Sequence, residues 1–415
     1  MNQLHLGDCL EVLKTLPENS VDSIVTDPPY GLSAAPNSGK KSTGGFMGKK
    51  WDYDVPSVEI WKECLRVLKP GGYLLAFAGT RTQHRMAVRI EDAGFEIRDM
   101  LAWVFGSGFP KSLDVSKAID KAAGANREVV GTKNLHGYKS KEDGNSRGSG
   151  LREDFDKVNQ LTAPATPEAK KWEGWGTALK PALEPITLAR KPLSEKTVAE
   201  NVLKWGTGGI NIDACRIPVN KDVDDPRLGG KGTWSSEKMA KNVYEGGYAG
   251  ERVSSSELGR FPANLIHDGS DEVLSAFPDA KGQQGDLKNH KREIISPNGI
   301  YGKQPPRKDA IARIETDKSA ARFFYCPKTT KKDRGEGNNH PTVKPTELML
   351  YLIKLVTKPE GITLDPFMGS GSTGKAAARG NFKFIGIERE QDFYNIAQAR
   401  INHEAKKPKQ QTFEF

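Results

Sequence analysis

Strand and helix patterns alternate at the two ends of this chain but not in its middle. Apolar or β-branched runs that indicate strands lie at 21–26, 73–78 and 361–364, and segments with helical spacing flank them. Strands that alternate with helices predict a mostly parallel sheet with helices on its faces. We therefore expect an α/β protein whose doubly wound sheet takes its strands from both ends of the chain.

Turn residues bound the expected elements. The run 69–72, Lys-Pro-Gly-Gly, follows an amphipathic segment and precedes an apolar one, which indicates a helix that stops before a strand. In the N-terminal part we expect a helix and then a strand within 4–30, helices over 58–68 and 81–93, and strands over 73–78 and 97–105. In the C-terminal part we expect helices over 346–356 and 391–403, a helix that ends at Arg379, and strands over 361–364 and 382–387.

The middle of the chain has a different character. Segment 106–180 has no regular pattern, a strand is indicated again at 183–189, and 195–339 shows short elements with many glycines. The whole chain has 415 residues, with 62 Lys and Arg against 53 Asp and Glu. Residues 281–334 alone hold 14 basic and 6 acidic residues, nearly the whole molecular excess. We interpret this segment as a surface that faces a polyanion, against the alternative of an ordinary solvated surface.

Composition excludes several classes of protein. The longest strongly apolar run, 73–78, is much shorter than the ~20 residues that span a bilayer, so we expect no membrane partner. The N-terminus lacks the pattern of a secretory signal. The four cysteines form no Cys-x-x-Cys pair, which argues against disulfides and zinc and favours a reducing cytoplasm. His340 has no second His or Cys at metal spacing, and we expect no metal.

The C-terminal motif combines a strand, a Gly-x-Gly turn at Gly369 and Gly371, a helix, and a second strand that ends at Glu388. Such a pattern is typical of nucleotide-cofactor sites, in which the glycines admit the ligand and the acid binds ribose hydroxyls. A phosphate-binding P-loop is a weaker alternative, because Ala376 lacks the hydroxyl that holds Mg²⁺. A dinucleotide oxidoreductase also stays possible from this motif alone, although Phe367 suits a pyrophosphate loop poorly.

A second motif, Asp27-Pro28-Pro29-Tyr30, follows the expected strand 21–26. The exocyclic amine of a nucleobase is a weak nucleophile, because its lone pair is delocalised into the ring. A carboxylate and a backbone carbonyl that accept its two N–H bonds would stabilise the charge that develops during attack. The two prolines fix the turn, and the tyrosine ring offers a stacking face for an unstacked base. The alternative is a proline-stiffened turn with a surface Asp.

The two motifs together resemble the S-adenosylmethionine-dependent amino-methyltransferases of DNA. Because the tetrapeptide precedes the Asp-Pro-Phe-x-Gly-Ser-Gly-Ser loop, the order is similar to the circularly permuted β class of that family. Blocks 7–10, 66–72 and 340–345 resemble further family blocks in the same order. The resemblance implies a Rossmann-like sheet and the cofactor S-adenosylmethionine.

It also implies roles for named residues. Asp27 and the Pro28 carbonyl would hold the target amine, with Pro29 in the turn and Tyr30 beside the flipped base. Glu388 would bind the ribose, Asp8 the adenine amine, and Asp365 would lie near the amino-acid end of the cofactor. The remaining cofactor-binding residues implied by the resemblance are Lys344, Phe367, Gly369, Gly371 and Ser372.

The resemblance also implies a division of the chain into segments and a set of binding partners. Double-stranded DNA would be the substrate, and a homodimer is a further option. The location would be the cytoplasm of a prokaryotic cell or a phage-infected host. The expected segments are a catalytic half 1–105, a partly irregular insert 106–180, a returning strand 181–194, a target-recognition domain 195–339, a cofactor half 340–405 and a basic tail 406–415.

Several reactions compete with this assignment. The family uses Asp-Pro-Pro-Tyr mainly for adenine and Ser-Pro-Pro-Tyr mainly for cytosine, so we expect adenine-N6 and keep cytosine-N4 open. Cytosine-C5 methylation needs a cysteine that follows a proline, and none of the four does. Protein glutamine methylation uses Asn-Pro-Pro-Tyr with the cofactor motif first. An inactive nucleic-acid-binding module is a further alternative, against which the intact motifs argue.

Overall fold

The computed structural model describes residues 2–31, 54–106, 108, 112–132, 160–218, 259–280, 319–327, 338 and 343–407. Most of the basic segment 281–334, and His340, lie outside these residues. By its internal contacts the chain divides into two compact units. Unit 1 comprises Met1–Gly106 and Leu183–Phe415, and unit 2 comprises Ser107–Ala182.

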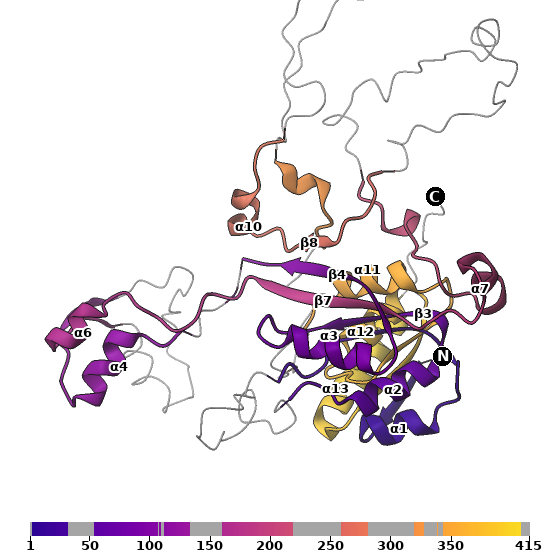
Figure 1. The fold of residues 1–415 in the computed structure, drawn as a ribbon, viewed down its shortest axis with the longest axis horizontal. Coiled ribbons are helices and arrows are strands. Elements are labelled where there is room, and N and C mark those ends of the chain that lie inside the picture. The colour runs from indigo at the N-terminus through magenta and orange to yellow at the C-terminus, as the bar shows by residue number, and fades with distance from the viewer. Residues whose placement is uncertain are drawn as a thin grey trace, which may run out of the picture. The chain divides into compact units, whose positions relative to one another are not determined.

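The described part of unit 1 is built on an eight-stranded sheet of order β1-β10-β9-β2-β3-β7-β4-β8 (Figure 1). The strands β1, β10, β9, β2 and β3 run parallel to one another. Strand β7 is antiparallel to both of its neighbours, β3 and β4, and β8 is parallel to β4. The strands are β1 (Asn2–Leu6), β2 (Val21–Thr26), β3 (Leu68–Phe77), β4 (Glu96–Val104), β7 (Leu183–Arg190), β8 (Leu265–His267), β9 (Ile362–Asp365) and β10 (Lys383–Glu388).

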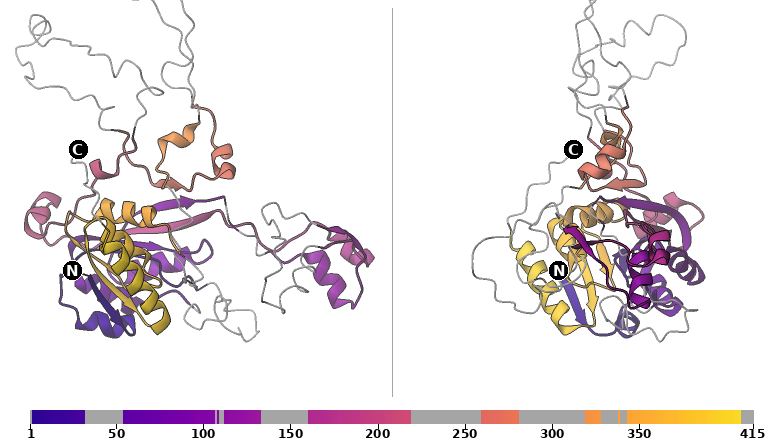
Figure 2. Two further views of the ribbon diagram at one scale, coloured as in Figure 1. Left: turned by 180° about the vertical axis from the view of Figure 1, so that it is seen from behind. Right: turned by 90° about the vertical axis from the view of Figure 1, so that its left-hand side faces the viewer.

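Helices from the two chain ends cover opposite faces of this sheet (Figure 2). On one face pack α11 (Thr346–Val356), α12 (Ser372–Arg379) and α13 (Gln391–Ala405). On the other pack α1 (Cys9–Thr15), α2 (Val58–Val67) and α3 (Gln83–Asp92). Strands between two helical layers are apolar on both faces, and every residue of β2 is buried. The expected α/β, doubly wound fold with a mostly parallel sheet is confirmed.

Two local expectations were wrong. The prediction of a helix and then a strand within 4–30 missed β1, an edge strand that starts with the polar pair Asn2-Gln3 and so lacks a strand pattern. The run 69–72 does not separate a helix from a strand, because β3 begins at Leu68. These residues instead form an irregularity in the pairing with β2, where Gly71 has a φ of 79°.

Within unit 1, the described parts of 195–339 form short elements, several of which contact the sheet or its helices. Helix α7 (Val198–Trp205) contacts β3, the 3₁₀ helix Asp213–Cys215 contacts α11, and β8 extends the sheet beside β4. The remaining described elements of this stretch are α10 (Asp271–Ala276) and the 3₁₀ helix Ala320–Phe323. The assignment of 195–339 to target recognition stays a prediction.

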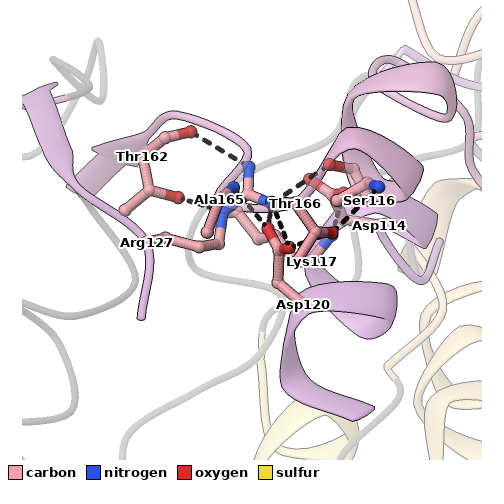
Figure 3. A network of polar contacts seen from close by, with 9 residues as sticks. Asp114, Ser116, Lys117, Asp120, Arg127, Thr162, Ala165 and Thr166 are labelled. Atoms are coloured by element: carbon pink, nitrogen blue, oxygen red, sulfur yellow. Dashed lines mark hydrogen bonds and ion pairs between the residues drawn. The ribbon is translucent and has the colours of Figure 1, made fainter. Parts of the chain in front are cut away.

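Unit 2 nearly coincides with the expected insert 106–180, which was predicted to be partly irregular, and its described residues include regular elements. It contains α4 (Val115–Ala122), α6 (Pro167–Lys171) and a two-stranded antiparallel sheet of β5 (Val129–Thr132) and β6 (Gln160–Thr162). A network around the buried Asp120 joins them (Figure 3). Arg127 pairs with the Asp120 carboxylate, which also accepts hydrogen bonds from the backbone of Ala165 and Thr166. Burial raises the pKa of Asp120, but these hydrogen bonds outweigh it and lower the pKa below its ordinary value.

This network predicts the effect of Asp120→Asn. The amide cannot accept all of these hydrogen bonds or balance Arg127, so the segment around β6 and α6 should open more often. In hydrogen-exchange mass spectrometry, peptides that cover 160–171 should exchange about tenfold faster than in the wild type, as expected for a loss of ~1.4 kcal/mol of local protection. The exposed Glu128→Gln is the matched control. Unchanged exchange in Asp120→Asn would contradict the role of the network.

Candidate functional site

The predicted site residues follow strands that end at one edge of the sheet. In parallel strands all carboxyl ends point the same way, and ligands of such sheets bind there. Asp27 follows β2, Asp365 ends β9 and Glu388 ends β10. The register pairs Leu6 of β1 with Glu388, so that Asp8 follows at the same edge. The structure thus brings the residues of the two distant sequence motifs to one edge.

The loop between β9 and α12 is tied to the acid at the end of β10. The backbone N–H of Gly369 donates to Glu388 Oε2 at 2.8 Å, and that of Glu390 donates to Oε1 at 2.8 Å. Burial raises the pKa of Glu388, which these backbone hydrogen bonds partly oppose. Gly369 and Gly371 have φ values of 53° and 80°, a backbone region that glycine adopts readily. The acid and the glycine turn are therefore joined into one hydrogen-bonded element.

Three other predicted cofactor residues lie around this element. Asp8 is exposed, caps α1 by accepting from the N–H of Leu10, and follows Gly7, whose N–H donates to the Glu388 carbonyl at 2.9 Å. Ser372 is the first residue of α12 and is nearly buried. Phe367 is half-buried, and its ring meets that of the buried Trp61 edge-on at 6.1 Å.

Asp365 occupies a more interior position than its predicted role implies. It is 2% exposed, and it accepts hydrogen bonds from the hydroxyls of Thr26 and Thr373, each at 2.6 Å, and from the N–H of Phe367. Burial, with a contribution from Asp27, raises the pKa of Asp365 to about 6 although these hydrogen bonds lower it. Its side chain therefore fastens the loop after β9 to the strand that carries Asp27.

Two side chains, Tyr30 and Lys344, contact the carboxylate of Asp27, and Glu184 and Phe77 contact Lys344 in turn. The hydroxyl of Tyr30 donates to Oδ1 at 2.8 Å, and the ammonium of Lys344 lies 2.9 Å from Oδ2. The same ammonium lies 3.0 Å from the carboxylate of Glu184 and 3.0 Å from the Tyr30 hydroxyl. The ammonium is also 4.8 Å from the centre of the Phe77 ring. Lys344, predicted as a cofactor contact, is therefore placed at the tetrapeptide.

The turn 28–31 is held from both sides. Pro28 is buried, Pro29 is half-buried, and the carbonyl of Tyr30 accepts a hydrogen bond of 2.6 Å from the hydroxyl of Thr82. Burial and the charges of Asp27 and Glu184 raise the pKa of the Tyr30 hydroxyl, which stays protonated and can donate. The ring, expected as a stacking face, is half-buried and faces the Lys344 ammonium at 5.4 Å.

Sequence reasoning missed three residues of this site: Thr26, Thr82 and Glu184. Thr26 directly precedes the tetrapeptide, which is a usable signal, whereas Thr82 comes from a distant helix start. Glu184 lies at the beginning of the expected strand 183–189, and the direction of that strand could not be read from its composition. Because β7 runs antiparallel to β3, its first residues lie at the edge where β3 ends.

This edge offers hydrogen-bond acceptors that suit the nucleoside part of a cofactor, and Asp27 lies at the same edge to accept from a reactive amine. Ribose hydroxyls and the adenine amine are donors, and Glu388 and Asp8 present carboxylates at neighbouring strand ends. Beside these carboxylates, Gly369 and Gly371 lack Cβ atoms, so the loop backbone can approach a ligand closely. The residues present therefore fit S-adenosylmethionine.

The comparisons with known proteins agree with this geometry. The family model described as DNA methylase, for N6 and N4 methyltransferases, matches residues 21–130 and 237–399, which is more than half of the chain. The chain belongs to this family of S-adenosylmethionine-dependent amino-methyltransferases that act on DNA.

Relatives extend the likeness along the chain. The Type II methyltransferase M.HindIII of Haemophilus influenzae is 25% identical over 432 aligned residues, which cover 97% of this chain and 95% of that protein. The Type II methyltransferase M2.LlaDCHI of Lactococcus lactis subsp. cremoris is 44% identical over 73 residues, 18% of this chain and 27% of that protein.

Among solved structures, the M1.HpyAVI–SAM complex has a TM-score of 0.38 at 17% identity and covers 96% of this chain and 100% of that one. The PvuII DNA methyltransferase (cytosine-N4-specific) has a TM-score of 0.42 at 15% identity and covers 96% and 85%. Within the described residues of this chain, no helix is long and apolar enough to cross a membrane, and no group of three metal-ligating side chains occurs.

Gly371→Ala should weaken cofactor binding. An added Cβ would lie 2.9 Å from the Cβ of Ala397 and 3.0 Å from its Cα, and a φ of 80° costs an L-residue roughly 1–2 kcal/mol. The loop must shift, so we expect at least about tenfold weaker binding of S-adenosylmethionine by calorimetry. Gly209→Ala, with no atom near the added Cβ, is the control. Equal affinity of Gly371→Ala and the wild type would refute the importance of this turn.

The raised pKa of Asp365 predicts a pH-dependent stability. A carboxyl that binds its proton more tightly in the folded state stabilises the fold at low pH, and this contribution is lost as the pH rises through about 6. Relative to Asp365→Asn, the wild type should therefore gain about 1 kcal/mol or more of unfolding free energy between pH 7 and pH 5. Urea unfolding at both pH values measures this difference. A constant difference would show that Asp365 titrates normally.

Proposed function

We propose that this chain is a site-specific methyltransferase that transfers a methyl group from S-adenosylmethionine to the N6 amine of adenine in double-stranded DNA. One observation carries the proposal: the carboxylate of Asp27 and the predicted cofactor loop lie at the same edge of the sheet, joined by the Thr26–Asp365 hydrogen bond. The Asp-Pro-Pro-Tyr form of the tetrapeptide supports adenine. Cytosine-N4 uses the same amine chemistry and is the alternative outcome of the test.

The residues on the catalytic side would act on the amine directly. Asp27 and the Pro28 carbonyl accept its two N–H bonds and stabilise the positive charge that develops as the nitrogen attacks. Tyr30 and Lys344 donate to Asp27 and keep its oxygens at fixed positions. Because these groups are held in place before the base arrives, the protein does not have to rearrange during the attack, and catalysis consists of positioning the amine.

The residues on the cofactor side would bind and orient. Glu388 accepts from the ribose hydroxyls, Asp8 accepts from the adenine amine, and the loop of Gly369 and Gly371 lets the backbone approach. Bound S-adenosylmethionine supplies an electrophilic methyl on a sulfonium. Asp365 positions the loop relative to Asp27, because both of its oxygens accept hydrogen bonds within the protein.

A base that is stacked and paired within a duplex cannot bring its amine to Asp27 at the end of β2. We infer that the target nucleotide is extruded, at a cost of a few kcal/mol of unstacking. The charge excess of 281–334 supports a DNA-facing role for 195–339. We place the reaction in the bacterial cytoplasm, where the substrate is found.

Asp27→Asn tests the assignment. The amide keeps the shape of the side chain but loses its charge, so transfer of tritiated methyl from S-adenosylmethionine to duplex DNA should fall at least about 100-fold. Cofactor affinity should change less than about threefold, since Asp27 serves the amine. Asp92→Asn, an exposed carboxylate at the end of α3, is the control.

Chromatography of the labelled nucleosides then identifies the acceptor. Label in N6-methyl-2′-deoxyadenosine supports the proposal, and label in N4-methyl-2′-deoxycytidine would identify cytosine instead of adenine as the acceptor. A wild-type protein that binds S-adenosylmethionine and DNA without labelling any nucleoside would be the inactive binding module.

A further inference from the structure

The cluster at Asp27 contains a carboxylate, that of Glu184, which the proposed reaction does not use. Glu184 is the second residue of β7 and lies across from Trp103 of β4 in the sheet. Its Oε2 is 3.0 Å from the Lys344 ammonium and 3.4 Å from the Tyr30 hydroxyl. Lys344 and Tyr30 each touch Asp27 as well, so two groups connect the carboxylates.

The ammonium of Lys344 has a partner for each of its three N–H bonds. An ammonium carries three donors and no acceptor. Its neighbours are one carboxylate oxygen of Asp27, one of Glu184, and the hydroxyl oxygen of Tyr30, all at 2.9–3.0 Å. The side chain is only 9% exposed, so water has little access to compete. Removal of any partner would leave a buried donor unpaired, which is costly.

The charges of the cluster depend on one another. Both carboxylates lie within hydrogen-bond distance of the same nitrogen, and their oxygens are therefore at most about 6 Å apart, where like charges repel strongly. Burial alone would lower the pKa of Lys344, but Asp27 and Glu184 outweigh it and raise the pKa. The ammonium lies between the two carboxylates and is attracted to both.

We propose that Glu184 is a positioning residue of the methyl-transfer site, which shares the ammonium of Lys344 with Asp27 and so helps to hold the acceptor carboxylate in place for the target amine. This inference rests on the proposed function. Lys344 acts through Asp27 here and does not bind the cofactor.

The test is a double-mutant cycle measured as kcat and KM for methyl transfer. Glu184→Gln should lower kcat about tenfold, and Lys344→Met about 100-fold, because Asp27 and Glu184 then face each other without a cation. The double variant Lys344→Met/Glu184→Gln should be several times more active than Lys344→Met alone, because the second change removes the repulsion. KM for S-adenosylmethionine should stay within about threefold throughout.

The pH profile separates positioning from mere structure. The described titratable and charged groups around Asp27 are Tyr30, Glu184, Lys344 and Asp365. In Lys344→Met the acid limb of kcat should move up by about one pH unit or more, and the double variant should restore it. Lys344→Arg should retain most of the activity, since it keeps the charge.

Matched controls break ion pairs of the same kind at the opposite edge of the sheet. Lys69→Met removes the nearer of two lysine partners of Asp22 near the start of β2, and Glu96→Gln removes the carboxylate that pairs with Arg190 at the far end of β7. Both should leave kcat and its pH profile unchanged. Equal losses in the controls and the site variants would reduce the cluster to a structural role and overturn the proposal.

Two further results would overturn it. Strictly additive losses in the double variant would show that Glu184 and Asp27 do not share Lys344. A Lys344→Met variant with unchanged kcat and a greatly raised KM for S-adenosylmethionine would place this lysine on the cofactor.

The cluster can also be tested apart from the reaction, should the wild type transfer no methyl group. Without Lys344, one of the two carboxylates binds its proton more tightly in the folded state, which stabilises the fold at low pH. Urea unfolding should therefore show Lys344→Met losing stability between pH 5 and pH 8 relative to the double variant. The absence of this difference would refute the charge coupling, whatever the activity of the chain.

Discussion

The hydrogen bond between Thr26 and Asp365 is the contact on which the site depends. It joins residues 339 positions apart, one directly before the tetrapeptide and the other at the head of the glycine loop. Strands β2 and β9 are neighbours in the sheet, and both ends of the chain must be in place before this pair can form. With the Thr373 hydroxyl on its other oxygen, Asp365 fixes the start of α12 as well. The distance between the tetrapeptide and the glycine loop is thereby set by buried, short contacts.

The antiparallel direction of strand β7 also shapes the site. A parallel strand at this position would place its first residue at the far edge of the sheet, away from Asp27. Because β7 runs the other way, Glu184 comes to the edge that holds Asp27, and Arg190 comes to the opposite edge, where it pairs with Glu96. The edge thus gains a second carboxylate, and Lys344 balances both. Strand direction, rather than a motif, determines the local charge.

Much of the fold and the core of the site could be predicted from sequence. Helix 346–356 was predicted at its observed bounds, because a long apolar segment after a proline leaves little ambiguity. The order of the two motifs implied that both chain ends form one sheet. The sequence did not predict edge strand β1, because about half of its residues are polar. It did not predict the place of Glu184 in the site, because no local pattern encodes the direction of a strand. Lys344 was selected from its motif, but its contact with Asp27 arises only when distant segments meet.

Base-resolved sequencing of DNA from cells that express the chain tests the central claim most directly. A carboxylate held at the cofactor edge of the sheet should modify one exocyclic amine at one defined sequence. We predict N6-methyladenine at that sequence in nearly every copy, and none in cells that express Asp27→Asn. Methyl groups on cytosine N4 would contradict the choice of base. Unmodified DNA, from cells whose purified protein binds S-adenosylmethionine, would contradict the account of the site itself.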